Sequence, residues 1–182
     1  MKSWLLTFGL AFVTGMALGQ STFYQLNIND LDNNQIALSN FTGEKILITE
    51  CSMASPDLRK LKFLDSLYMN NPNTLDIIVV PTEDFDTTLG RIDLKKLLID
   101  SLHFHFIVSA PGYGTKAKAG KQLPLMKWLT NAVNNRHFDN DLLSVNQTFV
   151  ISETGVLFAE MMGPADLYIK ITAILKAKAP DS

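Results

Sequence analysis

The segment that most constrains the fold is Ile46–Leu64, ILITECSMASPDLRKLKFL, which holds the only cysteine of the chain. Ile46–Thr49 are apolar or β-branched and predict a short buried strand. Ser55 and Pro56 predict the start of a helix, because serine is a frequent N-cap and proline suits the first helical position. Leucines then recur at helical spacing and give this helix one apolar face: Leu58, Leu61, Leu64 and Leu67. Cys51 therefore lies between a strand and a helix.

A thiol at such a place is a candidate nucleophile. The dipole and the free N–H groups of a helix N-terminus stabilise a thiolate. One cysteine cannot form an internal disulfide, so Cys51 is a free thiol, an intermolecular partner or an inert buried residue.

The first 19 residues, MKSWLLTFGLAFVTGMALG, have the layout of a secretory signal peptide with cleavage before Gln20. The alternative is a membrane anchor, but the apolar run is shorter than the roughly 20 residues that a span needs. The absence of a cysteine at the cleavage point argues against a lipid anchor. We therefore expect a secreted or periplasmic protein, with no membrane span after cleavage.

Residues 20–182 are expected to form one domain, since their length suits a single core and no repeat interrupts them. The formal net charge is −2 and no basic stripe is present, which argues against a nucleic-acid partner. The one group of lysines is expected to be a solvated loop: Lys116, Lys118 and Lys121.

The order of the predicted elements indicates an α/β fold. An N-terminal β-hairpin is expected from the alternation of Tyr24, Leu26 and Ile28 before the turn at 32–34. The near-continuous apolar run 75–80 predicts a strand covered on both faces, and hence a parallel one. The later elements are a helix at 92–102, a strand at 103–108, a helix with Leu125, Trp128 and Leu129 on one face, a hairpin at 148–160 and a helix at 167–176. This order predicts a mixed central sheet flanked by helices, which matches a thioredoxin-like fold.

The segment FYQLNINDLDNNQIALSNFTGEKILITECSMASPDLRKL resembles the N-terminal half of a glutathione peroxidase. The resemblance continues in the same order through DIIVVPTEDF, PLMKWL and NQTFVISETGVLFAEM. It implies a thioredoxin-like fold and thiol-dependent reduction of hydroperoxides in the oxidative stress response. It also implies an external thiol reductant, glutathione or thioredoxin, with no bound cofactor and no metal.

The family places a selenocysteine or cysteine in the loop after this strand. Matching ILITECSMAS without a gap implies Ser55 at that position, whereas counting back from Pro56 implies Ser52. We prefer Ser55, because it needs no gap and lies at the expected helix start. Neither register reaches Cys51, which becomes a tentative substitute nucleophile.

The other members of the family's catalytic tetrad are also replaced. Its glutamine corresponds to Asp84 in PTEDF, and its tryptophan and asparagine correspond to Ser144 and Val145 when counted back from Gly155. A peroxidatic thiol must ionise, but carboxylates are expected around this loop and raise the pKa of a nearby thiol: Glu50, Asp57, Glu83 and Asp84.

Two hypotheses follow. The first is a secreted glutathione-peroxidase-like enzyme that uses Cys51 and an external thiol, with impaired or absent activity. The second is a non-catalytic thioredoxin-fold binding protein. Other candidates are structural: His103 and His105 lack a third metal ligand, Glu83, Asp84 and Asp86 are expected to face water, and Trp128 and Phe149 are expected in the core.

Overall fold

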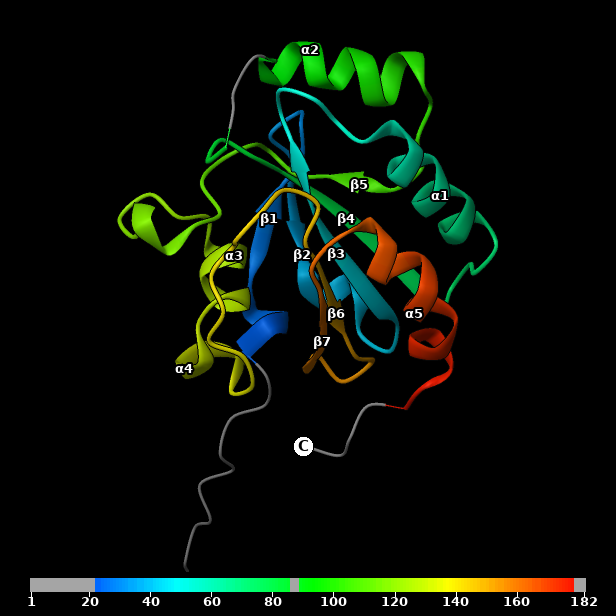
Figure 1. Cartoon of the computed structure of the whole chain (residues 1–182), viewed down its shortest axis with the longest axis vertical. Coiled ribbons are helices and arrows are strands. Elements are labelled where there is room, and N and C mark those ends of the chain that lie inside the picture. The colour runs from blue at the N-terminus through cyan, green and yellow to red at the C-terminus, as the bar shows by residue number, and fades with distance from the viewer. Residues whose placement is uncertain (1–21, 86–88, 179–182) are drawn as a thin grey trace, which may run out of the picture.

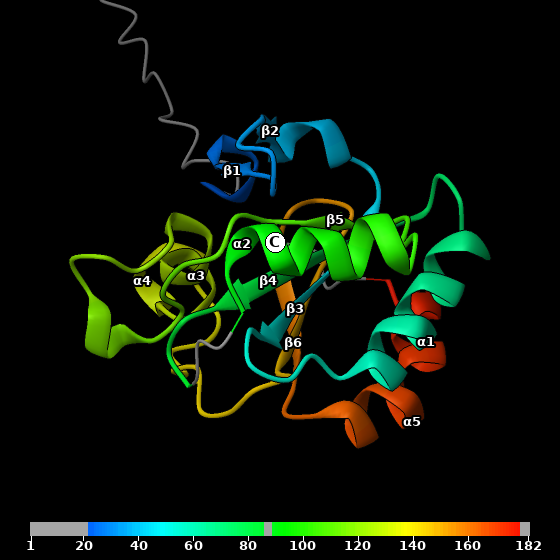
Figure 2. The same cartoon turned by 90° about the horizontal axis from the view of Figure 1, so that it is seen from above.

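A computed structural model describes residues 22–85 and 89–178, and it shows a mixed five-stranded sheet with helices on both faces (Figures 1 and 2). The strand order is β5-β4-β3-β6-β7, with a separate two-stranded sheet β1-β2. The strands are β1 (Asn27–Asn29), β2 (Gln35–Ala37), β3 (Lys45–Ser52), β4 (Leu75–Thr82), β5 (Ile107–Val108), β6 (Thr148–Ile151) and β7 (Leu157–Met161). The helices are α1 (Leu58–Met69), α2 (Arg91–Lys95) with its π-helical continuation η3 (Lys96–Ser101), α3 (Pro124–Leu129), α4 (Ala132–Asn135) and α5 (Pro164–Lys176). Short 3₁₀ helices are η1 (Thr22–Gln25), η2 (Leu38–Phe41) and η4 (Lys116–Lys118).

The centre of the sheet is the parallel pair β3 and β4, as the apolar sequence of β4 predicts. Both strands are buried along almost their whole length. β5 extends the parallel part, whereas β6 pairs antiparallel with β3 and with β7. The turn between β6 and β7 contains Gly155 with a φ of 80°, a left-handed conformation that glycine adopts without strain.

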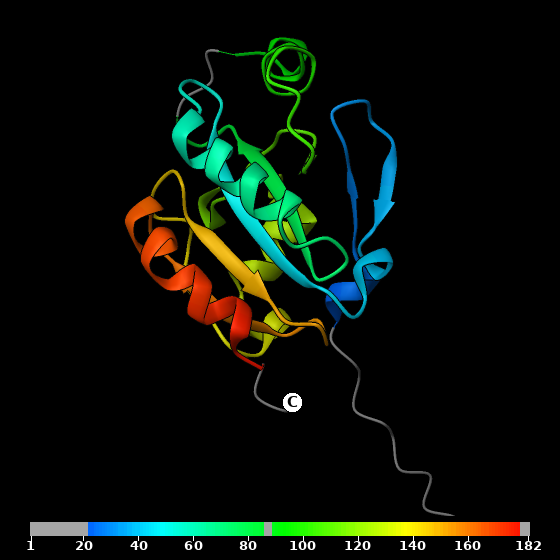
Figure 3. The same cartoon turned by 90° about the vertical axis from the view of Figure 1, so that its right-hand side faces the viewer.

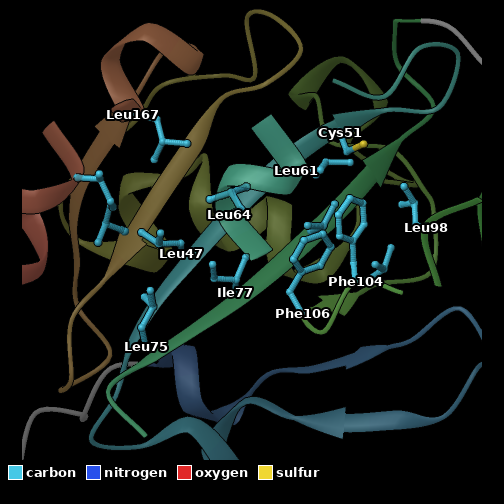
Figure 4. Packing of buried hydrophobic residues seen from close by; sticks show 14 of the residues in the cluster. Leu47, Cys51, Leu61, Leu64, Leu75, Ile77, Leu98, Phe104, Phe106 and Leu167 are labelled. Carbon is cyan, nitrogen blue, oxygen red and sulfur yellow. The ribbon is translucent and has the colours of Figure 1, made fainter. Parts of the chain in front are cut away.

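Two apolar clusters lie on opposite faces of the sheet. Alternate residues of each strand point to opposite faces, so Leu47 and Ile77 join one cluster while Ile46 and Ile78 join the other. The first cluster is covered by α1 and α5 (Figure 4), and the second by α3, η1 and the hairpin. Figure 3 shows α1 and α5 together on one side of the sheet, with the blue hairpin on the other.

Three local predictions were wrong at their edges. The N-cap of α1 is Asp57, whose side chain accepts a hydrogen bond from Lys60 N at 3.0 Å, so Ser55 does not cap the helix and Pro56 precedes it. Tyr24 belongs to η1, and the ladder of the hairpin begins only at Asn27. Of the predicted strand 103–108, only β5 is regular, because the backbone turns at His103, where φ is 53°.

The predicted signal peptide, residues 1–19, lies outside the described residues, and so does Asp86. Within the described part of the chain, no helix is long and apolar enough to cross a membrane.

Candidate active site

The candidate site lies at the carboxyl end of β3 and β4, where the two parallel strands end side by side. Cys51 is the last but one residue of β3 and lies opposite Pro81 of β4. Its side chain points to the face covered by α1 and packs in the same cluster as Leu61 and Leu98 (Figure 4). The thiol is thus part of the apolar core and does not lie in the following loop.

Burial controls the ionisation of this thiol. Cys51 is 1% exposed, and its sulfur donates a hydrogen bond to Ser52 O at 3.6 Å. The pKa of the Cys51 thiol is raised to about 12, mainly by desolvation and in smaller part by the negative charges of Glu50 and Asp57, against the opposing charge of Lys60. Of the four carboxylates expected to raise this pKa, Glu50 and Asp57 do so, but removal of the thiol from water is the larger cause.

Glu50 forms a buried hydrogen-bonded centre on the opposite face of β3. One carboxylate oxygen accepts from Thr82 Oγ1 at 2.6 Å, and the other accepts from the main-chain N–H of Asn146. Burial raises the pKa of Glu50, whereas these two hydrogen bonds and the charge of Lys60 lower it. The carboxylate therefore joins three segments: β3, the end of β4 and the loop before β6.

Lys60 is a buried cation from the first turn of α1. It is 1% exposed, and its Nζ donates to Asn146 O at 2.8 Å. Desolvation lowers the pKa of Lys60 to about 8, while the charge of Glu50 opposes this shift. Because Lys60 and Glu50 both bond to the main chain of Asn146, they fasten this loop over the end of the sheet.

Sequence reasoning missed Lys60, Thr82 and Asn146. Lysine is rarely buried unless it is paired, so the sequence of α1 gives no sign that Lys60 points inward. Asn146 adopts a left-handed conformation with a φ of 72°, which asparagine tolerates better than most residues. The tolerance of asparagine for this conformation is the one local feature of the sequence that could have indicated the turn at Asn146.

Ser52 and Ser55 lie in different surroundings. The Oγ of Ser52 is half-buried and accepts from the N–H groups of Ala54 and Ser55, at 3.2 and 3.1 Å. The side chain of Ser55 is exposed. Two converging amides would favour an anion at position 52, whereas position 55 faces water.

Asp84 holds a neighbouring loop in place. Its carboxylate accepts from the N–H of Gly114, from Thr115 N at 3.2 Å and from Thr115 Oγ1 at 2.5 Å. The group at this position therefore accepts hydrogen bonds that fix residues 114–115. A glutamine there could donate from its amide, but a carboxylate cannot.

Ser144 and Val145 are half-buried residues of the loop before β6. They immediately precede Asn146, whose main chain makes the contacts with Glu50 and Lys60. The loop thus reaches the site, but through peptide groups of the next residue.

The two histidines lie away from the site. His103 and His105 are exposed, and His105 Nδ1 lies 3.2 Å from a carboxylate oxygen of Asp65. No cluster of three or more metal-ligating side chains is found among residues 22–85 and 89–178. Trp128 and Phe149 are buried in the apolar core, as expected.

Comparison with known proteins shows which class of fold this is. No known family profile matches the sequence, and no curated protein matches it. Among solved structures, the apo form of Trgpx is similar with a TM-score of 0.61 and 18% identity, over 87% of this chain and 98% of that one. T. cruzi GPX1 gives a TM-score of 0.58 and 16% identity, over 84% and 95%. A thiol:disulfide interchange protein of the thioredoxin family from Chlorobium tepidum TLS gives 0.55 and 11%, over 82% and 92%.

The chain therefore has a thioredoxin-like fold, as its sequence predicts. At these identities the similarity shows the fold alone, and the chemistry must be argued from the residues of the site.

Proposed function

We propose that this chain is a non-catalytic, glutathione-peroxidase-like protein that keeps a thioredoxin-like scaffold for binding. The observation that carries this proposal is the state of Cys51, which is buried in the core with its pKa raised to about 12. Only on the order of 1 in 10⁵ molecules would hold a thiolate at pH 7 in that environment.

A peroxidase reaction needs that thiolate. The sulfur anion attacks one oxygen of the hydroperoxide, the O–O bond breaks, and an alkoxide leaves as the sulfur becomes a sulfenic acid. One external thiol then condenses with the sulfenic acid, releasing water and forming a mixed disulfide, and a second thiol attacks that disulfide to release the cysteine and an external disulfide. In this chain the first step lacks both the anion and a path for the peroxide to a sulfur that is 1% exposed.

The other positions of the family's tetrad support the same conclusion. Asp84 is an acceptor that fixes the adjacent loop, and Ser144 and Val145 make none of the hydrogen bonds that join their loop to the described site. The Ser55 register remains a prediction, as do the signal peptide and a secreted or periplasmic location.

The competing hypothesis is a secreted peroxidase in which Cys51 is exposed by local opening. It would use a hydroperoxide as substrate and glutathione or thioredoxin as reductant. The fold of the similar structures is compatible with either hypothesis.

Peroxide turnover separates the two. Purified protein and its Cys51→Ser variant would be mixed with hydrogen peroxide and either a thioredoxin or a glutathione system, and reductant consumption would be followed. We expect equal rates at the level of the protein-free blank. Thiol-dependent turnover that disappears in Cys51→Ser would overturn the proposal.

A further inference from the structure

Strand β1 has an edge that is only partly paired. The hydrogen bonds that close the hairpin around Asn27 and Asn29 are each 3.0 Å long: Leu38 N to Leu26 O, and Asp30 N to Asn34 O. Because hydrogen-bonded and non-hydrogen-bonded pairs alternate in an antiparallel ladder, the main-chain groups of Asn27 and Asn29 point away from β2. They form the outer edge of the hairpin.

One half of this edge already pairs with another segment. Asn29 O accepts from Ala110 N at 2.6 Å, so the residues after β5 continue the ladder there. The segment then turns away, and Gly112 N donates to Pro81 O at 3.3 Å. Among the hydrogen bonds of the described residues, none engages the main-chain N–H or C=O of Asn27.

A cavity of about 170 Å³ lies where this ladder stops. It separates β1 from the start of α3, and its lining is mainly apolar, with Val80, Leu123 and Leu125 among the lining residues. β1 lies beside α3 in Figure 1. A second, more open cavity of about 400 Å³ shares Pro124 with the first and continues the groove beyond the start of β1, beside Gln25 and Leu26.

The far end of the groove carries one cationic side chain. Lys127 is exposed there, and it is the one charged residue among those that line the two cavities in the described part of the chain. A ligand that fills the apolar cavity and carries a carboxylate at its other end would complement this arrangement.

We propose that this groove binds an extended peptide strand, which pairs with the main chain of Asn27, inserts an apolar side chain beside Leu123 and places a carboxylate near Lys127. In such strand addition, main-chain hydrogen bonds give affinity and a side-chain pocket gives specificity. The existing contact from Ala110 to Asn29 shows that this edge accepts an extended segment, and a peptide would continue the same ladder. The inference goes beyond the proposed function, because it does not depend on the reactivity of Cys51.

The test uses a short peptide of alternating threonine and valine that ends in aspartate, acetylated at its N-terminus and amidated at its C-terminus so that the aspartate side chain is its one carboxylate. It would be titrated into ¹⁵N-labelled protein, and the amide shifts of Asn27 and Asn29 would be followed by NMR. We expect saturable shifts at Asn27 and around the groove. Absence of saturable shifts, or shifts confined to other surfaces, would overturn the inference.

A matched pair of proline variants tests the strand pairing. Asn27→Pro removes the N–H that faces the groove, and Gln35→Pro removes one that faces the opposite edge of the hairpin, since both residues belong to non-hydrogen-bonded pairs. We expect Asn27→Pro to weaken binding about tenfold and Gln35→Pro to leave it within about twofold. Equal affinity of the two variants would contradict strand pairing.

Modified peptides give the same information without altering the fold. A peptide with N-methylated amides cannot donate to the edge, and one that ends in asparagine lacks the carboxylate. We expect the N-methylated peptide not to bind. We expect the peptide that ends in asparagine to bind the native protein with the same reduced affinity that the acidic peptide has for Lys127→Gln. An N-methylated peptide that binds as well as the parent would overturn the proposal even if both proline variants failed to fold. Binding that persists in Cys51→Ala would show that the inference stands whatever the outcome of the peroxide assay.

Discussion

Cys51 and Ser52 are adjacent in β3, yet their side chains lie in opposite surroundings. The sulfur of Cys51 lies in the apolar cluster under α1, whereas the Oγ of Ser52 accepts hydrogen bonds from Ala54 and Ser55. A strand turns successive side chains to opposite faces, so one residue of register decides between core and loop. The only cysteine of this chain occupies the position that faces the core.

Moving the thiol by one residue should therefore change its chemistry. In a Cys51→Ala background, we expect Ser52→Cys to titrate with a lower pKa than Ser55→Cys, because two N–H groups face position 52 and stabilise a thiolate. The pH dependence of iodoacetamide alkylation measures both pKa values. A higher pKa at position 52 would show that Glu50 and Asp57 outweigh the two amides.

The buried thiol also makes folding depend on pH. The pKa of Cys51 is about 12 in the folded protein and near 9 when unfolded, so its contribution to stability is fully present below pH 9 and is lost as the pH rises towards 12. Relative to Cys51→Ala, the native protein should lose about 1.4 kcal/mol of unfolding free energy per pH unit above 9. Urea unfolding of both proteins at pH 7 and pH 10 measures this difference, and a constant difference would contradict the assigned burial.

At the scale of elements, α1 carries the contacts that close the site. Asp57 caps the helix through Lys60 N, and the side chain of Lys60 reaches Asn146 in the loop before β6. The same helix therefore shields Cys51 and fixes the loop. Its N-terminus is capped by Asp57, a residue of this chain.

The N-cap of α1 at Asp57 can be tested against Ser55, the N-cap that the sequence predicts. Asp57→Ala should lower the unfolding free energy by about 1 kcal/mol, because an N-cap acceptor is lost. Ser55→Ala is the matched control, and we expect a change within about 0.5 kcal/mol, since Ser55 is exposed. A larger loss in Ser55→Ala than in Asp57→Ala would place the cap at Ser55 after all.

The sequence was most informative where a pattern repeats. The apolar run of β4 and the β6-β7 hairpin around Gly155 are confirmed by the structure. The leucines of α1 are confirmed in part, since Leu61 and Leu64 are buried whereas Leu58, at the start of the helix, is exposed. Single-residue features were harder to predict. Asp57 and Ser55 are both good N-caps by residue type, so only the backbone geometry distinguishes them.

The pairing of the two strands that carry the candidate site was predictable, but the contacts around their ends were not. The carboxyl ends of β3 and β4 meet as expected from a parallel pair. The inward direction of Lys60 and the main-chain contacts of Asn146 depend on tertiary packing, which leaves no periodic trace in the sequence.

At the scale of the whole molecule, the two ends of the sheet hold ionisable groups of different kinds. The carboxyl end holds the buried thiol with Glu50 and Lys60, and the amino end holds Asp76 beside Glu44. Burial, and then the charge and hydrogen bond of Glu44, raise the pKa of Asp76 to about 7. The free energy of unfolding should therefore depend on pH through ionisable groups at both ends of the sheet.

The amino end gives a prediction of its own. Because the folded pKa of Asp76 is higher than the unfolded value of 3.8, the stability that its protonated form supplies is lost as the pH rises from about 4 to about 7. Asp76→Asn removes this loss, so the variant should gain stability relative to the native protein between pH 4 and pH 8. Thermal unfolding of both proteins across that range measures the change. A variant that loses stability relative to the native protein as the pH rises would contradict the raised pKa of Asp76.

The central claim concerns the thiol, and its native-state alkylation between pH 6 and pH 9 tests that claim most directly. We expect iodoacetamide to modify Cys51 no faster than the protein unfolds, at every pH in this range, and to modify it rapidly once urea exposes the core. Alkylation within minutes at pH 7 without denaturant, with a titration midpoint below the ordinary pKa of a thiol, would show an accessible thiolate and contradict the account.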